Sequence, residues 1–118
     1  MKIEDFILLI KSSEINAHIY HWRTTSYAAH KALEGYYEAA RDLVDKLVEN
    51  AQGKFGLKYD LKGAIEISDL SQSSYFLQLS HQAQIMSEKL FSEYKDLENI
   101  AQEILEEINK INYLLTLS

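Results

Sequence analysis

The stretch GKFGLKYDLKGAIEISDLSQ, residues 53–72, decides how this chain folds, because it interrupts the helical spacing of apolar residues on either side of it. It holds three of the four glycines and a short alternating piece, AIEIS at 64–68, which favours extended chain. Twenty residues are long for a connection inside a compact domain. At about 3.3 Å per extended residue, this stretch can cross the length of a helical bundle and join two parallel helices.

Helical spacing fills the rest of the chain, where apolar residues recur every three or four positions. We expect helices over residues 3–24, 26–52, 74–93 and 96–116, with Gly53 ending the second. The break near 94–96 has neither glycine nor proline, so one continuous helix over 74–116 remains an alternative. The expected fold is all-α, a four-helix bundle with a long crossover between its second and third helices, in one domain over residues 1–118. Residues expected in the core include Phe6, Leu9, Tyr20, Leu33, Tyr37, Val44, Leu47, Leu79, Met86, Leu90, Ile100, Ile104, Ile108 and Ile111.

The candidate site lies in the preceding stretch, HIYHWRTTSYAAHKALEGYYEAARDLVDKLVEN at 18–50. Relative to His30, the side chains at 34, 45 and 49 are rotated by roughly 40°, 60° and 100° around an ideal helix, so one imidazole and three carboxylates share a face. Such a mixed nitrogen and oxygen set suits a first-row divalent metal. The alternative is a solvated face on which Arg41 neutralises its acidic neighbours.

The spacing also separates these candidate ligands into two groups. His30 and Asp45 are fifteen residues apart, or roughly 22 Å along a helix, so they cannot bind one metal ion. His21 lies before the expected turn at 24–26 and can approach His30 there. A two-fold dimer with antiparallel second helices would bring Asp45 and Glu49 of one copy to His21, His30 and Glu34 of the other. We therefore expect a homodimer or a higher homo-oligomer.

These residues resemble the signature of the mini-ferritins called Dps, which has a His-Trp pair, a second histidine, an acidic residue four positions later, and an Asp-x-x-x-Glu pair. The matching positions here are His21-Trp22, His30, Glu34, Asp45 and Glu49. The resemblance implies a ferritin-like bundle whose intersubunit sites bind and oxidise Fe(II), as di-iron or mono-iron centres, with zinc or manganese as other metals. His18 is an alternative to His21 as the ligand, because the segment between Trp22 and His30 is about three residues shorter than in the Dps pattern.

A second, looser resemblance is to small uncharacterised ferritin-like proteins of tailed phages, through HKALEGYYE, QGKFG and the closing LENIAQEI and INYLL. That resemblance implies the fold and no activity. The alternative function is therefore a non-enzymatic helical dimer or oligomer that binds a host protein or a small ligand, with any metal serving only to hold the structure together.

Composition and charge exclude several kinds of partner, location and chemistry. A net charge of −6 and the absence of a basic tail argue against nucleic acid as a partner. The apolar start FILLI is far shorter than a secretory or membrane-spanning segment, so we expect no export and no membrane anchor. The chain has no cysteine, which excludes disulfides and thiolate chemistry and agrees with an expected cytoplasmic location.

Overall fold

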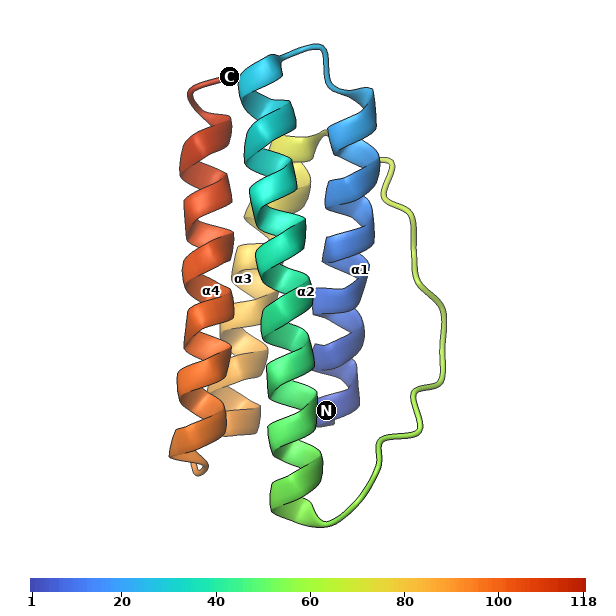
Figure 1. Cartoon of the computed structure of the whole chain (residues 1–118), viewed down its shortest axis with the longest axis vertical. Helices are drawn as coiled ribbons and strands as arrows, with labels where there is room; N and C mark the ends of the chain where they lie inside the picture. Colours follow the sequence, from blue (N-terminus) through green and yellow to red (C-terminus); the bar gives the residue numbers. More distant parts are fainter.

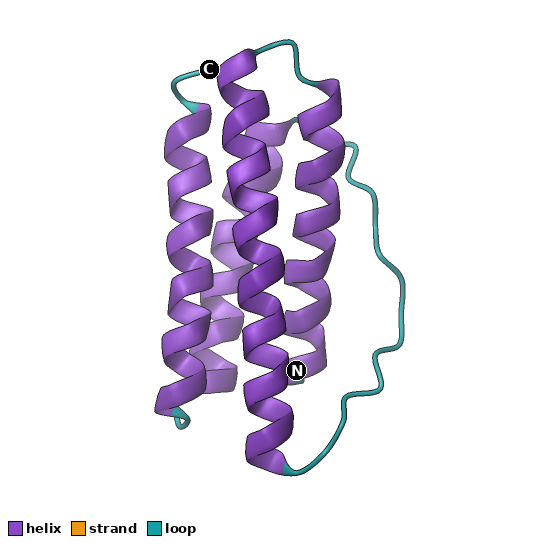
Figure 2. Cartoon of the chain, in the orientation of Figure 1, coloured by secondary structure: helices purple, strands orange, loops and turns teal.

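Four helices account for most of the chain in the computed structural model, which describes residues 1–118. They are α1 (Ile3–Arg23), α2 (Tyr27–Phe55), α3 (Gln72–Phe91) and α4 (Lys95–Leu115), and no strand is present. Figure 2 shows the helices in purple and the connections in teal. The predicted all-α four-helix bundle is confirmed.

The crossover between α2 and α3 sets the direction of the helices. In Figure 1, α1 runs up the bundle, α2 runs down, the crossover returns along the outside, α3 runs down and α4 runs up. Helix α1 packs on α2 and α3, and α4 packs on the same two helices. Helices α2 and α3 therefore point the same way, as the length of the linker predicts. The AIEIS piece forms no strand and lies within this crossover.

The helix ends follow from local capping chemistry. Ser26 caps α2, with its side chain accepting a hydrogen bond from the Ala29 amide. The prediction that Gly53 ends α2 is wrong, because α2 continues to Phe55 and Gly56 is the cap, with a φ of 65°. That left-handed conformation suits glycine and lets the Gly56 amide bond to the carbonyl of Gln52.

The second helical hairpin corrects two further predictions. Helix α3 spans 72–91 rather than 74–93, because Ser71 accepts a hydrogen bond from the Ser74 amide and so caps it. The alternative of one continuous helix over 74–116 is wrong, since the chain turns between Phe91 and Lys95. Folding back is favoured because it buries the apolar stripe of α4 in the bundle, where an extended continuation would leave it in water.

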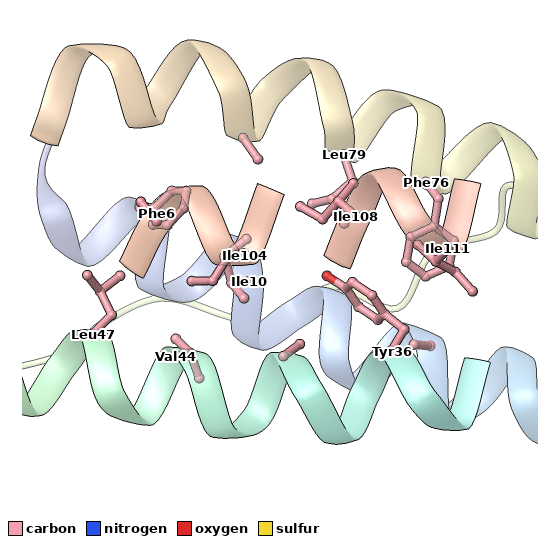
Figure 3. Packing of buried hydrophobic residues seen from close by; sticks show 14 of the residues in the cluster. Phe6, Ile10, Tyr36, Val44, Leu47, Phe76, Leu79, Ile104, Ile108 and Ile111 are labelled. Atoms are coloured by element: carbon pink, nitrogen blue, oxygen red, sulfur yellow. The ribbon is translucent and has the colours of Figure 1, made fainter. Parts of the chain in front are cut away.

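A single core of buried apolar side chains runs through all four helices (Figure 3). The predicted stripe of α4 is confirmed in full. Tyr37 was expected in the core and is only half-buried, because the neighbouring Tyr36 takes that place. Leu9, Met86 and Leu90 are also half-buried, and Phe76 and Phe91 fill the α3 part of the core. The buried α4 residues are Leu97, Ile100, Ala101, Ile104, Ile108, Ile111 and Leu115.

Two buried polar side chains, those of Ser13 and Asn16, have hydrogen-bond partners inside the bundle. The Ser13 hydroxyl lies 2.7 Å from the Tyr36 hydroxyl, linking α1 to α2, and donates to the Ile10 carbonyl. Asn16 donates to the Glu66 carbonyl and accepts from the Ser68 amide, so it fastens the crossover to α1. Every buried side-chain nitrogen and oxygen has a partner.

The outer faces of the helices are mostly polar. Ion pairs three residues apart lie on three helices, such as Lys11 with Glu14 on α1, and the exposed ones contribute little to stability.

The helices lack a stretch both long and apolar enough to cross a lipid bilayer.

Candidate functional site

The turn between α1 and α2 brings two of the candidate histidines face to face. Helix α1 ends at Arg23, α2 begins at Tyr27, and only three residues connect them. His21 in the last turn of α1 and His30 in the first turn of α2 stack with their ring centroids 3.6 Å apart and their planes 18° from parallel. The tight corner therefore produces a histidine pair from residues nine positions apart.

Reciprocal hydrogen bonds fix both rings. Nδ1 of His21 is 2.7 Å from the His30 carbonyl oxygen, and Nδ1 of His30 is 2.8 Å from the His21 carbonyl oxygen. A carbonyl oxygen only accepts, so each Nδ1 carries the proton and donates. In the neutral form of each ring, the lone pair is then on Nε2. Metal-binding histidines use the same arrangement, in which a hydrogen bond at one ring nitrogen orients the other toward the metal.

Glu34 lies one turn after His30 on α2. Its carboxylate is 3.1 Å from the Lys31 ammonium, which holds the pKa of the Glu34 carboxyl below its usual range. His21 and His30 lower the same pKa to a lesser degree. The two imidazoles and this carboxylate therefore lie at the same α1–α2 corner, although the three are not close enough to hold a metal ion within one chain.

His18 sits one turn before this pair in a different environment. Its ring stacks on Tyr37 at 4.4 Å between centroids and contacts Trp22 at 4.3 Å, while His21 is 6.0 Å away. None of its ring nitrogens makes a hydrogen bond within the chain. His18 is therefore held by aromatic packing, whereas His21 is held by a hydrogen bond that orients Nε2.

Asp45 and Glu49 form the second group, further along α2 and fully exposed. Their carboxyl groups approach each other closely, and the hydrogen bond and negative charge of Asp45 raise the pKa of Glu49. Arg41 does not neutralise them, because its guanidinium lies 3.6 Å from the carboxylate of Asp42 instead. This pair of like charges has no cation beside it in the chain.

The two groups remain apart within one chain. His30 and Asp45 are separated by about 22 Å along α2, which is a regular helix throughout. No group of three or more histidine, aspartate or glutamate side chains lies close enough together to hold a metal ion. Assembly of the five predicted ligands around one metal stays a prediction that requires a second copy of the chain.

Sequence reasoning missed several features of this corner. The sequence points to Trp22 only through the His-Trp pair and does not single out Tyr27, yet their side chains are 67% and 76% exposed beside the histidine pair. The exchange of carbonyl hydrogen bonds between His21 and His30 also had no sequence signal, since it depends on where the turn places two backbone groups. The only available hint was that each of these histidines lies within one turn of a helix end.

A family model matches residues 21–115, which include both groups of candidate ligands except His18. The chain belongs to this family. It is described as a family of unknown function, DUF5856. The matched region also covers α2, α3, α4 and the crossover.

A relative from Enterobacteria phage T4 extends the comparison. It is described as an uncharacterized 14.6 kDa protein in the mobD-ri intergenic region, and is 34% identical over 58 residues. The match covers 49% of this chain and 45% of the relative, so the chain spans less than half the length of that protein. No solved structure matches. The phage relative agrees with the predicted phage resemblance, and none of these comparisons points to Dps.

Proposed function

We propose that this protein is a Dps-like iron-binding protein, which binds Fe(II) at sites shared by two copies of the chain and passes electrons from the iron to dioxygen or peroxide. One observation carries the proposal: His21 and His30 each donate Nδ1–H to the other's carbonyl oxygen, which directs two Nε2 lone pairs away from those bonds. This tautomer leaves both Nε2 atoms with the lone pair that a metal ligand needs.

The donor chemistry fits iron. Two neutral imidazoles with the carboxylates of Glu34, Asp45 and Glu49 make a mixed nitrogen and oxygen set, which suits Fe(II) and also Mn(II) or Zn(II). A bound dication would also relieve the repulsion between Asp45 and Glu49 that raises the pKa of Glu49.

The register of α2 supports a dimer with two equivalent sites. His30 and Glu49 are centred on the point between Ala39 and Ala40, and Glu34 and Asp45 are centred on the same point. An antiparallel pairing of two α2 helices about that point therefore aligns both ligand pairs at once. Ala39 beside that point is small and only half-buried, which allows close approach, whereas Ala40 faces the core.

A second candidate function rests on the exposed aromatic side chains of Trp22 and Tyr27 at the same corner. Tryptophan and tyrosine are frequent among the residues that contribute most to protein interfaces. In this alternative, the protein is a non-enzymatic dimer or oligomer that binds a host protein or a small ligand, and any metal only holds the copies together.

An anaerobic titration of metal-stripped protein with Fe(II), followed by admission of oxygen, tests the proposal. The wild type is compared with Asp45→Ala/Glu49→Ala and with the control Glu93→Ala/Glu106→Ala, which removes two exposed carboxylates elsewhere. We expect saturable binding and rapid ferric absorbance in the wild type and control, and neither in the Asp45/Glu49 variant. Binding without oxidation would contradict the ferroxidase role and favour a structural metal. No binding by the wild type would contradict the whole proposal.

A further inference from the structure

A groove on the opposite side of α1 from α2 has no part in the proposed iron chemistry. It lies between α1, α3 and the crossover at 64–70, and encloses about 810 Å³. Apolar side chains dominate it, among them Leu9 of α1, Met86 of α3 and Ile67 of the crossover, which is 53% exposed. This volume is in the range of known ligand sites, which is roughly 300–1,000 Å³.

The crossover wall of this groove is fastened to α1 by side-chain hydrogen bonds. Asn16 holds both the carbonyl of Glu66 and the amide of Ser68, at 2.9 Å and 2.8 Å. The Tyr20 hydroxyl donates to the carbonyl of Leu70 at 2.7 Å. Asn16 is 2% exposed, so these anchors are shielded from competing water. The groove therefore has a fixed wall although it is bounded by a connecting segment (Figure 1).

The charged side chains that line the groove are all acidic. They belong to Asp5, Glu66 and Asp69, and no lysine, arginine or histidine side chain lines the groove. Asp5 lies toward the start of α1, whereas Glu66 is bonded at the level of Asn16. Eleven residues of helix separate those levels, or about 16 Å. An apolar groove with carboxylates at both ends complements an occupant with an apolar centre and positive charges at its ends.

The backbone of the wall is nearly extended, and its only hydrogen bonds between Gly63 and Leu70 are to side chains, at Glu66, Ser68 and Leu70. Gly63 lies beside Leu8 of α1, and the Leu70 carbonyl accepts a hydrogen bond from Tyr20 of α1. Seven residues of the crossover therefore extend over the same length as twelve residues of α1. This corresponds to about 2.6 Å per residue, nearer the 3.3 Å of extended chain than the 1.5 Å of a helix. No backbone to backbone hydrogen bond involves residues 58–70. Another extended chain can pair with such a segment.

We propose that this groove binds a short extended segment of a partner protein, about six residues long, with an apolar centre and lysine or arginine at each end. Six extended residues place their end charges about 16 Å apart, which matches the separation of the carboxylates. Pairing with the backbone groups of 64–67 that are not already bonded, which leaves out the Glu66 carbonyl, supplies main-chain hydrogen bonds, and the apolar floor takes the side chains on one face of the segment. A segment with acidic ends meets repulsion at both.

Fluorescence anisotropy with a labelled probe peptide tests this proposal. The probe is Lys-Leu-Val-Thr-Leu-Lys, and its counterpart has glutamate in place of both lysines. We expect saturable binding of the basic peptide, at least tenfold weaker binding of the acidic one, and at least tenfold weaker binding of the basic peptide to Glu66→Lys/Asp69→Lys. These two side chains are exposed and make no side-chain hydrogen bond, so the variant should fold, which circular dichroism checks.

The control variant Glu93→Lys/Glu106→Lys makes the same charge change outside the groove. It should keep wild-type affinity, and an equal loss in this control would contradict the groove as the site. Hydrogen exchange should show slower exchange of the amides at 64–67 when the peptide is bound, and unchanged exchange there would contradict strand pairing. Absence of binding at millimolar peptide would overturn the proposal. Tight binding of dodecyltrimethylammonium without binding of the peptide would also overturn the proposal, because the occupant of the groove would then be a small amphiphile.

Discussion

Replacing Ser13 by alanine should cost more stability than the size of the change suggests. Ser13 is 0% exposed and Tyr36 is 2% exposed, and their hydroxyl oxygens are 2.7 Å apart. Because the Ser13 hydroxyl donates to the Ile10 carbonyl, the Tyr36 hydroxyl donates to Ser13. Ser13→Ala leaves this buried donor without an acceptor, which costs about 1–3 kcal/mol. Tyr36→Phe leaves the Ser13 donor satisfied and should cost about 0.5–1.5 kcal/mol.

The double variant separates the hydrogen bond from the loss of packing. With Ser13→Ala and Tyr36→Phe together, no buried donor lacks an acceptor, so the double variant should be more stable than Ser13→Ala alone. Urea unfolding followed by circular dichroism, at one fixed protein concentration, gives the three free energies of unfolding. The losses in free energy of unfolding of the two single variants should add up to about 1–2 kcal/mol more than the loss in the double variant. Costs that add to within about 0.5 kcal/mol would refute the assignment of donor and acceptor.

Three other predictions concern stability. Gly35→Ala should raise the free energy of unfolding by about 0.5–1 kcal/mol in denaturant titrations, because Gly35 lies inside α2 and a Cβ there meets nothing within 4 Å; no gain would contradict this. Glu49→Gln should raise the thermal midpoint of unfolding at pH 7 and not at pH 4. Asp45 raises the pKa of Glu49 in the folded state, so the folded state binds this proton more tightly than the unfolded state does. The wild type therefore loses stability as pH rises through that pKa. An equal gain at both pH values would be evidence against charge repulsion. Burial raises the pKa of Tyr36 far above its usual range, so stability should fall as pH climbs above about 10, and Tyr36→Phe should flatten this decline in urea midpoints measured between pH 9 and 11. A wild-type slope in that variant would show that other groups, such as Tyr75, account for the decline.

The bundle and its crossover could be predicted from the sequence because both depend on pattern and length. The isoleucines of α4 repeat at helical spacing, and all of them are buried. The crossover was predicted from loss of that spacing over residues 53–72. The exact end of α2 could not be predicted, since Gly53 and Gly56 are equally permissive. What distinguishes them is where the chain leaves the bundle, and the left-handed φ of 65° falls at Gly56.

The candidate site could be predicted in part. The meeting of His21 and His30 follows from the turn at 24–26, which the sequence marks with threonine and serine. Which face of α2 is buried was harder to predict. Tyr36 and Tyr37 are neighbours about 100° apart around the helix, and both lie near the edge of the apolar stripe. Packing against Phe76 and the hydroxyl of Ser13 selects Tyr36, and these contacts come from distant parts of the chain.

A mixing experiment tests the shared iron site most directly. The first variant, His21→Asn/His30→Asn, keeps a side-chain N–H near the position of Nδ1 but has no Nε2. The second is Asp45→Ala/Glu49→Ala, and each variant alone should bind no Fe(II).

When equal amounts of the two variants are unfolded together and refolded, half of the dimers should contain one chain of each kind. In such a mixed dimer, one of the two sites has all wild-type ligands, because its histidines and its carboxylates come from different chains. Fe(II) binding should therefore return to about one quarter of the wild-type amount. No recovery in mixtures that do form mixed dimers would contradict a site built from two copies.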